Sequence, residues 1–127
     1  MSSLLSQAIA FREAMEQPLN TSDETVHELQ HSLIREEWHE FDEAFDREFV
    51  DLDQREENQI HQLKELADLV FVCYQFAAAR GWNLDLAMTR VFESNMSKLV
   101  DGKPLRREDG KVLKGPNYQP PVLDDLI

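Results

Sequence analysis

The chain has 127 residues, a length that suits one domain of ordinary size. It holds 25 Asp and Glu residues against 13 Lys and Arg residues, so its formal net charge is −12, and it lacks the basic surface that a general nucleic-acid-binding protein needs. With 42% hydrophobic residues and a single cysteine, Cys73, the sequence can form a core but neither an internal disulfide nor a multi-cysteine zinc site.

Hydrophobic runs are short along the whole sequence. None approaches the roughly 20 residues that a membrane-spanning helix needs. The start of the chain, Met1–Leu5, has no basic region followed by a long apolar stretch, as a signal peptide does. These features predict a cytoplasmic protein with neither a membrane nor a nucleic acid as partner.

Glycine and proline residues concentrate near the C-terminus. Only Gly81 and Pro18 precede residue 100, whereas three glycines and four prolines follow it. This distribution predicts an all-α protein with a four-helix bundle-like subunit. Residues 1–100 would form the helical domain, and residues 101–127 would form an irregular loop and tail of the same domain.

Four helices are predicted, at about residues 4–15, 21–45, 59–80 and 83–100. Thr21, followed three residues later by Glu24, is typical of a capping box at the start of the second helix. Gly81 suits the position just after the third helix. The charged segment 46–58 fits either a loop or a solvated helical extension. In the tail, Arg107–Val112 contains an Asp-Gly pair that predicts a tight turn.

Acidic residues occupy unexpected positions on the second helix. Placed at 100° per residue, the apolar residues between Val26 and Phe45 form one stripe. Glu37 lies in the middle of this stripe, Glu40 at its edge, and Glu36 one step further out. A carboxylate that faces a core must be protonated, paired or bound to a metal.

The third helix repeats this pattern. Leu69–Ala79 contains no charged residue, which is typical of a helix that is buried on all sides. Glu65 and Asp68 lie one turn apart just before it. Two carboxylate pairs, each spaced i and i+3, can face each other across a helix–helix contact. Their hard oxygen donors suit Mg²⁺ or Mn²⁺.

Other interpretations of these acids remain open. They could be exposed acids of an acid-rich chain, which explains Glu36 alone equally well, or members of a salt-bridged core, although few basic residues lie on these faces. The Glu-x-x-His pattern of di-iron bundles occurs three times, but always on the second helix rather than on two helices. His39 also points away from the apolar stripe, so we expect the four histidines to be solvent-exposed.

The fourth helix carries an apolar stripe formed by Leu84, Ala87, Met88, Val91, Phe92 and Leu99. Asn95 lies at the centre of this stripe, and Lys98 lies beside it. A buried Asn95 would make a hydrogen bond that fixes the helix register, or it would bind a base or sugar. Lys98 could equally reach solvent.

Basic residues concentrate between Lys98 and Lys114, where six of them face three acidic residues for a local net charge of +3. A basic segment beside an acidic metal site is what a polyphosphate substrate needs. The residues predicted to contact phosphate are Lys98, Arg107, Lys111 and Lys114. Any single one of them fits an exposed charged loop equally well.

The acidic motifs resemble those of a known family. Glu36-Glu37-Trp38-His39-Glu40, followed after 24 residues by Glu65-Leu66-Ala67-Asp68, is similar to the Glu-Glu-x-x-Glu and Glu-x-x-Asp motifs of MazG-like, all-α nucleoside triphosphate pyrophosphohydrolases. Residues 94–99 and 109–118 look like the C-terminal signature of a phage and bacterial single-domain subgroup. The resemblance covers roughly residues 26–121.

This resemblance implies an enzyme that converts an NTP or dNTP to the monophosphate with Mg²⁺ or Mn²⁺, using two or more ions per site. Glu37, Glu40, Glu65 and Asp68 would hold the metal, and Glu36 would hold metal or, like Glu37, act in catalysis. The subunits would form a homodimer or homotetramer, in the cytoplasm of a bacterium or of a phage-infected cell.

The substrate is less well defined by the resemblance. Some phage members of the subgroup act on dGTP, which favours that nucleotide here. A dUTP, dCTP or house-cleaning NTP pyrophosphatase remains an alternative. A function of another class, a non-catalytic acidic helical binding module, also remains open.

Overall fold

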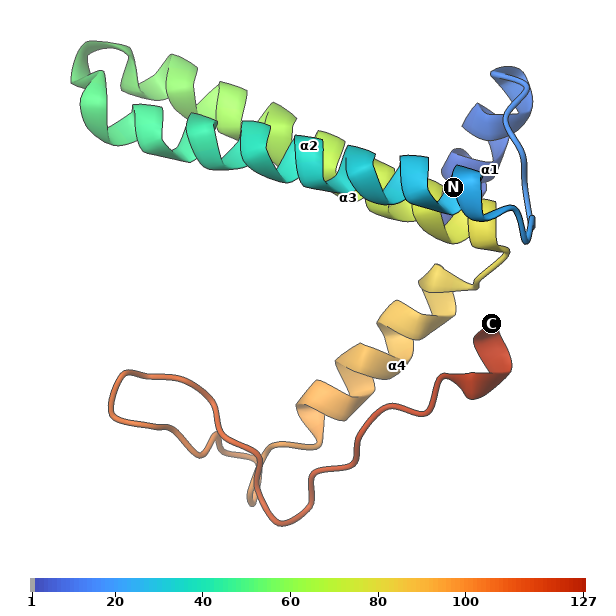
Figure 1. Ribbon diagram of the computed structural model, residues 1–127. Helices are drawn as coiled ribbons and strands as arrows, with labels where there is room; N and C mark the ends of the chain where they lie inside the picture. The colour runs from blue at the N-terminus through green and yellow to red at the C-terminus, as the bar shows by residue number, and fades with distance from the viewer. Residues whose placement is uncertain (1) are drawn as a thin grey trace. The chain divides into compact units, whose positions relative to one another are not determined.

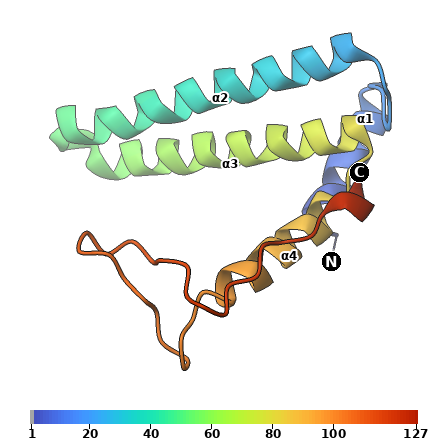
Figure 2. The same ribbon diagram turned by 60° about the horizontal axis from the view of Figure 1, so that its bottom comes forward.

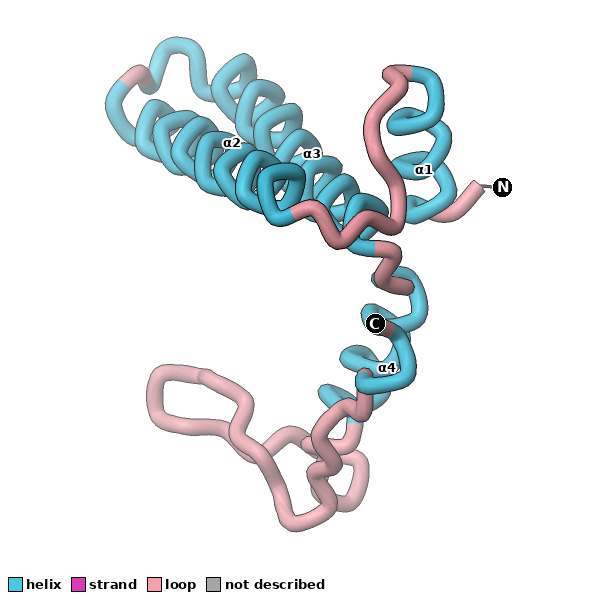
Figure 3. The backbone as a smooth tube through the Cα atoms, turned by 45° about the vertical axis from the view of Figure 1, so that its right-hand side comes forward, coloured by secondary structure: helices cyan, strands magenta, loops and turns pink. Residues whose placement is uncertain are grey.

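A computed structural model describes residues 2–127 of the chain. Its elements are α1 (Leu4–Ala14), α2 (Glu24–Val50), the 3₁₀ helix η1 (Leu52–Gln54), α3 (Arg55–Arg80), α4 (Leu84–Met96) and the 3₁₀ helix η2 (Asp124–Leu126). Within these residues the regular structure is helical, apart from two isolated β-bridges, and the segment after α4 is mostly loop (Figure 3). The prediction of an all-α protein with four α-helices is confirmed.

The chain divides into two compact units, and the boundary in the sequence falls between Trp82 and Asn83. The boundary predicted near residue 100 therefore falls inside the second unit. Among the described residues, no helix is both long and apolar enough to cross a membrane.

The first unit is built on a long antiparallel hairpin of α2 and α3, with α1 packed against α3 (Figures 1 and 2). The charged segment 46–58 is not an open loop, because it contains the last turn of α2, η1 and the first turn of α3. Asn58 fixes this connection by donating from Nδ2 to the carbonyl oxygens of Arg47 (3.3 Å) and Asp51 (3.2 Å). Of the two interpretations of the segment, the helical extension is the one observed.

Helix α2 begins two residues later than the predicted capping box. Its N-cap is Asp23, whose Oδ1 accepts a hydrogen bond from the backbone N–H of Thr25 at 3.0 Å. Thr21 stays in the preceding loop because its own N–H donates to the carbonyl oxygen of Ala79 at 2.8 Å. At the same end of the hairpin, Gly81 follows α3 with a left-handed φ of 78°, as predicted.

The interior of the first unit is small and partly polar. Its buried apolar side chains are mostly alanines, and Arg12 on α1 is only 1% exposed. The Arg12 guanidinium donates from Nε to the carbonyl oxygen of Pro18 (2.8 Å) and from Nη1 to Oε1 of Gln75 (3.3 Å). Gln75 in turn donates to the carbonyl oxygen of Ala8 (3.4 Å). Buried hydrogen bonds thus attach α1 to α3, and burial lowers the pKa of Arg12.

The uncharged stretch Leu69–Ala79 is buried on one side only, which corrects the prediction of burial all round. Tyr74 is buried, whereas Val70 and Phe71 are 41% and 37% exposed. These two exposed residues line an apolar groove along α3 together with Leu63 and Leu66. A two-helix hairpin gives α3 one long neighbour, so part of its opposite face stays uncovered within the first unit.

The second unit consists of α4 and the tail. Ser94, which is 7% exposed, donates from Oγ to the carbonyl oxygen of Gln119 at 2.7 Å. Arg90 donates to the carbonyl oxygen of Val122 at 2.9 Å and forms an ion pair with Asp125. These contacts hold the tail along α4.

The unit differs from the prediction at the end of its helix. Helix α4 ends at Met96, because the chain turns at residues 97–99 and Val100 pairs with Lys103. The predicted turn at 107–112 is confirmed. There the N–H of Arg107 donates to the carbonyl oxygen of Lys111 at 2.8 Å, and Gly110 has a φ of 90°.

Candidate metal centre

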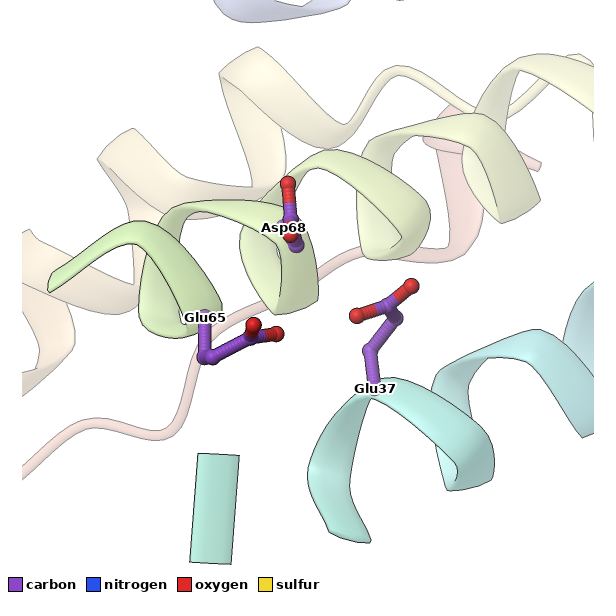
Figure 4. Close-up of side chains that lie close together, drawn as sticks. All are labelled: Glu37, Glu65 and Asp68. Carbon is purple, nitrogen blue, oxygen red and sulfur yellow. The ribbon is translucent and has the colours of Figure 1, made fainter. Parts of the chain in front are cut away.

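Three carboxylates converge in the middle of the hairpin. Glu37 extends from α2 toward α3, while Glu65 and Asp68 come from α3 (Figure 4). One oxygen of each carboxylate lies within 4.8 Å of the others. The i and i+3 spacing places Glu65 and Asp68 on one side of α3, and the position of Glu37 in the apolar stripe turns it toward them.

Burial makes this group unusual. Glu65 is only 5% exposed, and Glu37 is half-buried. The Oε2 atoms of both residues are buried and find no hydrogen-bond partner in residues 2–127. An unpaired buried carboxylate oxygen costs free energy, so the arrangement requires either a proton or a cation.

The electrostatics at Glu37 agree with this requirement. Loss of solvent raises the pKa of Glu37 to about 7, and the hydrogen bond with Glu40 and the negative charges of Glu40, Asp68 and Glu65 act in the same direction. Without a metal, ionisation of all these carboxylates at neutral pH is therefore unfavourable.

Two basic residues, Lys64 and His61, approach the group. The Nζ of Lys64 lies 2.7 Å from Asp68 Oδ2 and 3.5 Å from Glu65 Oε1, and His61 Nε2 lies 3.7 Å from Glu65 Oε1. The Lys64 side chain is 65% exposed, so it can withdraw when another cation binds. Sequence analysis missed both residues, although their i and i+4 spacing from Asp68 and Glu65 was a usable signal.

The donor set fits a hard divalent cation. It offers carboxylate oxygens alone, without thiolate or imidazole in the group of three, as Mg²⁺ and Mn²⁺ prefer. Three protein carboxylates leave coordination positions for water and for phosphate oxygens. Glu37, Glu65 and Asp68 could therefore hold a metal ion.

Two further acids of the predicted site lie outside this group. Glu40 is exposed, and it lies close enough to the group for its negative charge to help raise the pKa of Glu37. Glu36 is also exposed. Both positions agree with the helical periodicity of α2, which places Glu40 at the edge of the apolar stripe and Glu36 beyond it.

The predicted ligand residue of α4 is placed differently from expectation. Asn95 is exposed, and so are Met88 and Phe92 of the expected buried stripe, at 53% and 61%. The buried side of α4 is instead the one with Ser94, because the tail packs there through Gln119. Within the second unit nothing covers the apolar face that includes Asn95.

Of the four residues predicted to contact phosphate, two have a side-chain partner within the tail. Arg107 is paired with Asp109 inside the tail turn, and the Lys114 ammonium lies 4.8 Å from the ring centroid of Tyr118. Lys98 and Lys111 form no ion pair within residues 2–127. Their phosphate contacts stay predictions.

Only two of the four histidines are exposed as predicted, because His61 is partly buried beside Glu65 and His27 is buried. His31 and His39 are exposed, but His27 is buried, and its Nε2 lies 2.7 Å from the carbonyl oxygen of Thr21. The cause is the loop before α2, which folds back over the end of α3.

The chain was also compared with known proteins. No protein-family model matches the sequence, and no curated protein is significantly similar to it. Functional interpretation therefore depends on the chemistry of the site and on the motif resemblance.

Proposed function

We propose that this chain is a metal-dependent nucleoside triphosphate pyrophosphohydrolase, which converts a (d)NTP, with dGTP favoured, to the (d)NMP. The observation that supports this most is the pair of buried, unpartnered Oε2 atoms of Glu37 and Glu65 in a group of three carboxylates. The order and spacing of the acidic motifs, which resemble those of MazG-like enzymes, connect this group with nucleotide hydrolysis.

Each carboxylate has a role in this proposal. Glu37, Glu65 and Asp68 hold Mg²⁺ or Mn²⁺ between α2 and α3. Glu40, whose negative charge acts on Glu37, offers a further carboxylate for a second ion. The bound metal stabilises negative charge on the phosphate and makes an attacking water more acidic.

The bond changes are those of phosphoanhydride hydrolysis. The oxygen of a water molecule bonds to phosphorus, and the bridging bond between phosphorus and the leaving pyrophosphate oxygen breaks. Glu36 or Glu37 accepts the proton of the water. The products are the nucleoside monophosphate and pyrophosphate.

A substrate screen tests this proposal. The purified protein is incubated with each of the eight common NTPs and dNTPs in Mg²⁺, in Mn²⁺ and in EDTA, and monophosphate, pyrophosphate and phosphate are quantified. We expect metal-dependent monophosphate and pyrophosphate, fastest with dGTP. Absence of hydrolysis of all eight nucleotides with both metals would contradict the proposal.

Two variants make the screen specific to the site. Glu65→Gln removes a ligand and should lower turnover by about 100-fold or more, the upper range for losses at metal-site residues. Glu43→Gln is the matched control, because Glu43 is an exposed acid of α2 outside the group of three. Equal turnover in both variants would remove the site from the mechanism.

A further inference from the structure

A second polar pocket lies at the end of the hairpin where α2 begins and α3 ends. The loop at residues 20–22 forms one wall, and His27, Arg80 and Trp82 form the others. Ten residues separate His27 from Glu37, which is about 15 Å along α2 at about 1.5 Å per residue. The pocket is therefore distinct from the carboxylate group.

Arg80 is held in this pocket by two aromatic rings. Its guanidinium carbon lies 5.4 Å from the ring centroid of Phe76 and 4.9 Å from that of Trp82. Such contacts favour the cation and restrict the plane of its N–H groups. The donors of Arg80 are thus oriented before any ligand arrives.

These donors lack an acceptor. The Nε of Arg80 is buried without a hydrogen-bond partner, and no carboxylate in residues 2–127 forms an ion pair with this side chain. Arg12, by contrast, is buried with acceptors at Pro18 and Gln75. Arg80 lies in the last turn of α3, where the helix dipole favours a cation, but this position gives its N–H groups no acceptor.

The walls of the pocket are fixed by backbone hydrogen bonds. The N–H groups of Asn20 and Thr21 donate to the carbonyl oxygens of Ala78 (3.2 Å) and Ala79 (2.8 Å). Gly81 allows this close approach, since a Cβ added there would lie 2.2 Å from Oδ1 of Asn20. The hydroxyl and amide groups of the loop are consequently held beside Arg80.

We propose that this pocket binds a small oxyanion, a phosphate or carboxylate group, through the guanidinium of Arg80. The planar guanidinium can donate two parallel hydrogen bonds to either group, and Thr21, Ser22 and Asn20 offer further donors. Glu24, an exposed acid at the pocket, limits the affinity by repulsion. The inference does not depend on the proposed hydrolase activity.

Trp82 provides a direct measurement of binding. The chain has two tryptophans, so Trp38→Phe leaves Trp82 as the only one. This variant is titrated with inorganic phosphate and, separately, with acetate, against chloride at the same ionic strength. EDTA is present throughout to prevent binding through metal. We expect a saturable change in Trp82 emission with phosphate or acetate, and the responding anion identifies the ligand group.

Two substitutions in the same background should act in opposite directions. Arg80→Lys keeps the charge and the aromatic contacts but loses the paired donors, so the dissociation constant should rise about tenfold or more. Glu24→Gln removes the repelling charge and should lower the dissociation constant about twofold. Circular dichroism establishes that each variant is folded.

Three results would overturn the inference: no response beyond that of chloride, an unchanged dissociation constant in Arg80→Lys, or weaker binding in Glu24→Gln. If Arg80→Lys does not fold, the unsubstituted protein decides the question through its melting temperature. Phosphate or acetate must then raise the melting temperature above that in chloride. Because metal is absent, these results are independent of the nucleotide screen.

Discussion

Glu37 and Glu48 lie on the same side of α2, eleven residues apart. Helix α3 places hydrogen-bond donors beside Glu48 but carboxylates beside Glu37. Glu48 accepts hydrogen bonds from Gln59 (2.6 Å) and Gln62 (3.0 Å) and lies 3.5 Å from Nε of Arg55, and these contacts lower its pKa. Glu37 faces other carboxylates, and its pKa is raised to about 7. The hairpin supplies hydrogen-bond donors to Glu48, whereas Glu37 requires a proton or a cation.

This contrast predicts opposite effects of two amide substitutions on the metal-free protein. Glu37→Gln removes repulsion and should raise the melting temperature in EDTA, by about 4 °C or more for each kcal/mol gained. Glu48→Gln loses charge-assisted hydrogen bonds and should lower it. Thermal unfolding followed by circular dichroism measures both. A lower melting temperature for Glu37→Gln would show that its carboxylate is already stabilised without metal.

The pKa of Glu37 also predicts how stability depends on pH. A carboxyl whose pKa is 4.5 when unfolded and about 7 when folded binds protons more tightly in the folded protein. Its stabilising contribution is complete below pH 4.5 and is lost as the pH rises through about 7. The melting temperature in EDTA, compared with that of Glu37→Gln, should therefore fall between pH 5 and pH 8.

The comparison with Glu37→Gln removes the contribution of the other titrating groups. Saturating Mg²⁺ should reverse the trend, since protons and metal compete for the same oxygens. A difference between the two proteins that is constant over this pH range would contradict the raised pKa.

The exposed apolar groove on α3 predicts self-association, the expectation that the sequence first raised. Val70 lies in this groove between Leu66 and Phe71. We expect a dimer or tetramer in solution, and Val70→Asp should dissociate it at micromolar concentration because a charge cannot be buried there unpaired. Val70→Ala, which adds no charge, is the control. Light scattering that finds a monomer for the unsubstituted protein would refute this prediction.

The basic tail offers a test of the predicted phosphate contacts. Lys98→Ala and Lys111→Ala should each lower kcat/KM for the preferred nucleotide by about tenfold or more, the range for a charge-assisted hydrogen bond. Metal binding without nucleotide should be unchanged. Lys103→Ala is the control, as an exposed lysine of the same tail that is not among the predicted contacts. Full activity of a Lys98→Ala, Lys111→Ala double variant would exclude this role.

Much of the fold was predictable from local signals in the sequence. Gly81 placed the end of α3, and the periodicity of the apolar residues placed Glu37 on the side of α2 that faces α3, since both signals depend on residues close in sequence. The N-cap at Asp23 and the end of α4 at Met96 were not predicted. Both depend on contacts between segments distant in sequence, such as Thr21 with Ala79.

The carboxylate group was predictable for a related reason. Glu37 lies inside an apolar stripe, and Glu65 and Asp68 share one side of α3, so helical geometry puts them on the sides that meet when the two helices pack. The exposure of Asn95 was not predictable in this way. An apolar stripe shows which face can be buried, but only the tertiary structure shows what covers it.

Glu37, Glu65 and Asp68 are proposed to bind a divalent metal. Calorimetric titration of Mn²⁺ into the metal-free protein tests this proposal most directly, with Glu65→Gln and the exposed-acid control Glu43→Gln measured alongside. We predict saturable binding that weakens about 100-fold or more in Glu65→Gln and is unchanged in Glu43→Gln. Absence of saturable binding, or equal affinity in the unsubstituted protein and Glu65→Gln, would contradict the account.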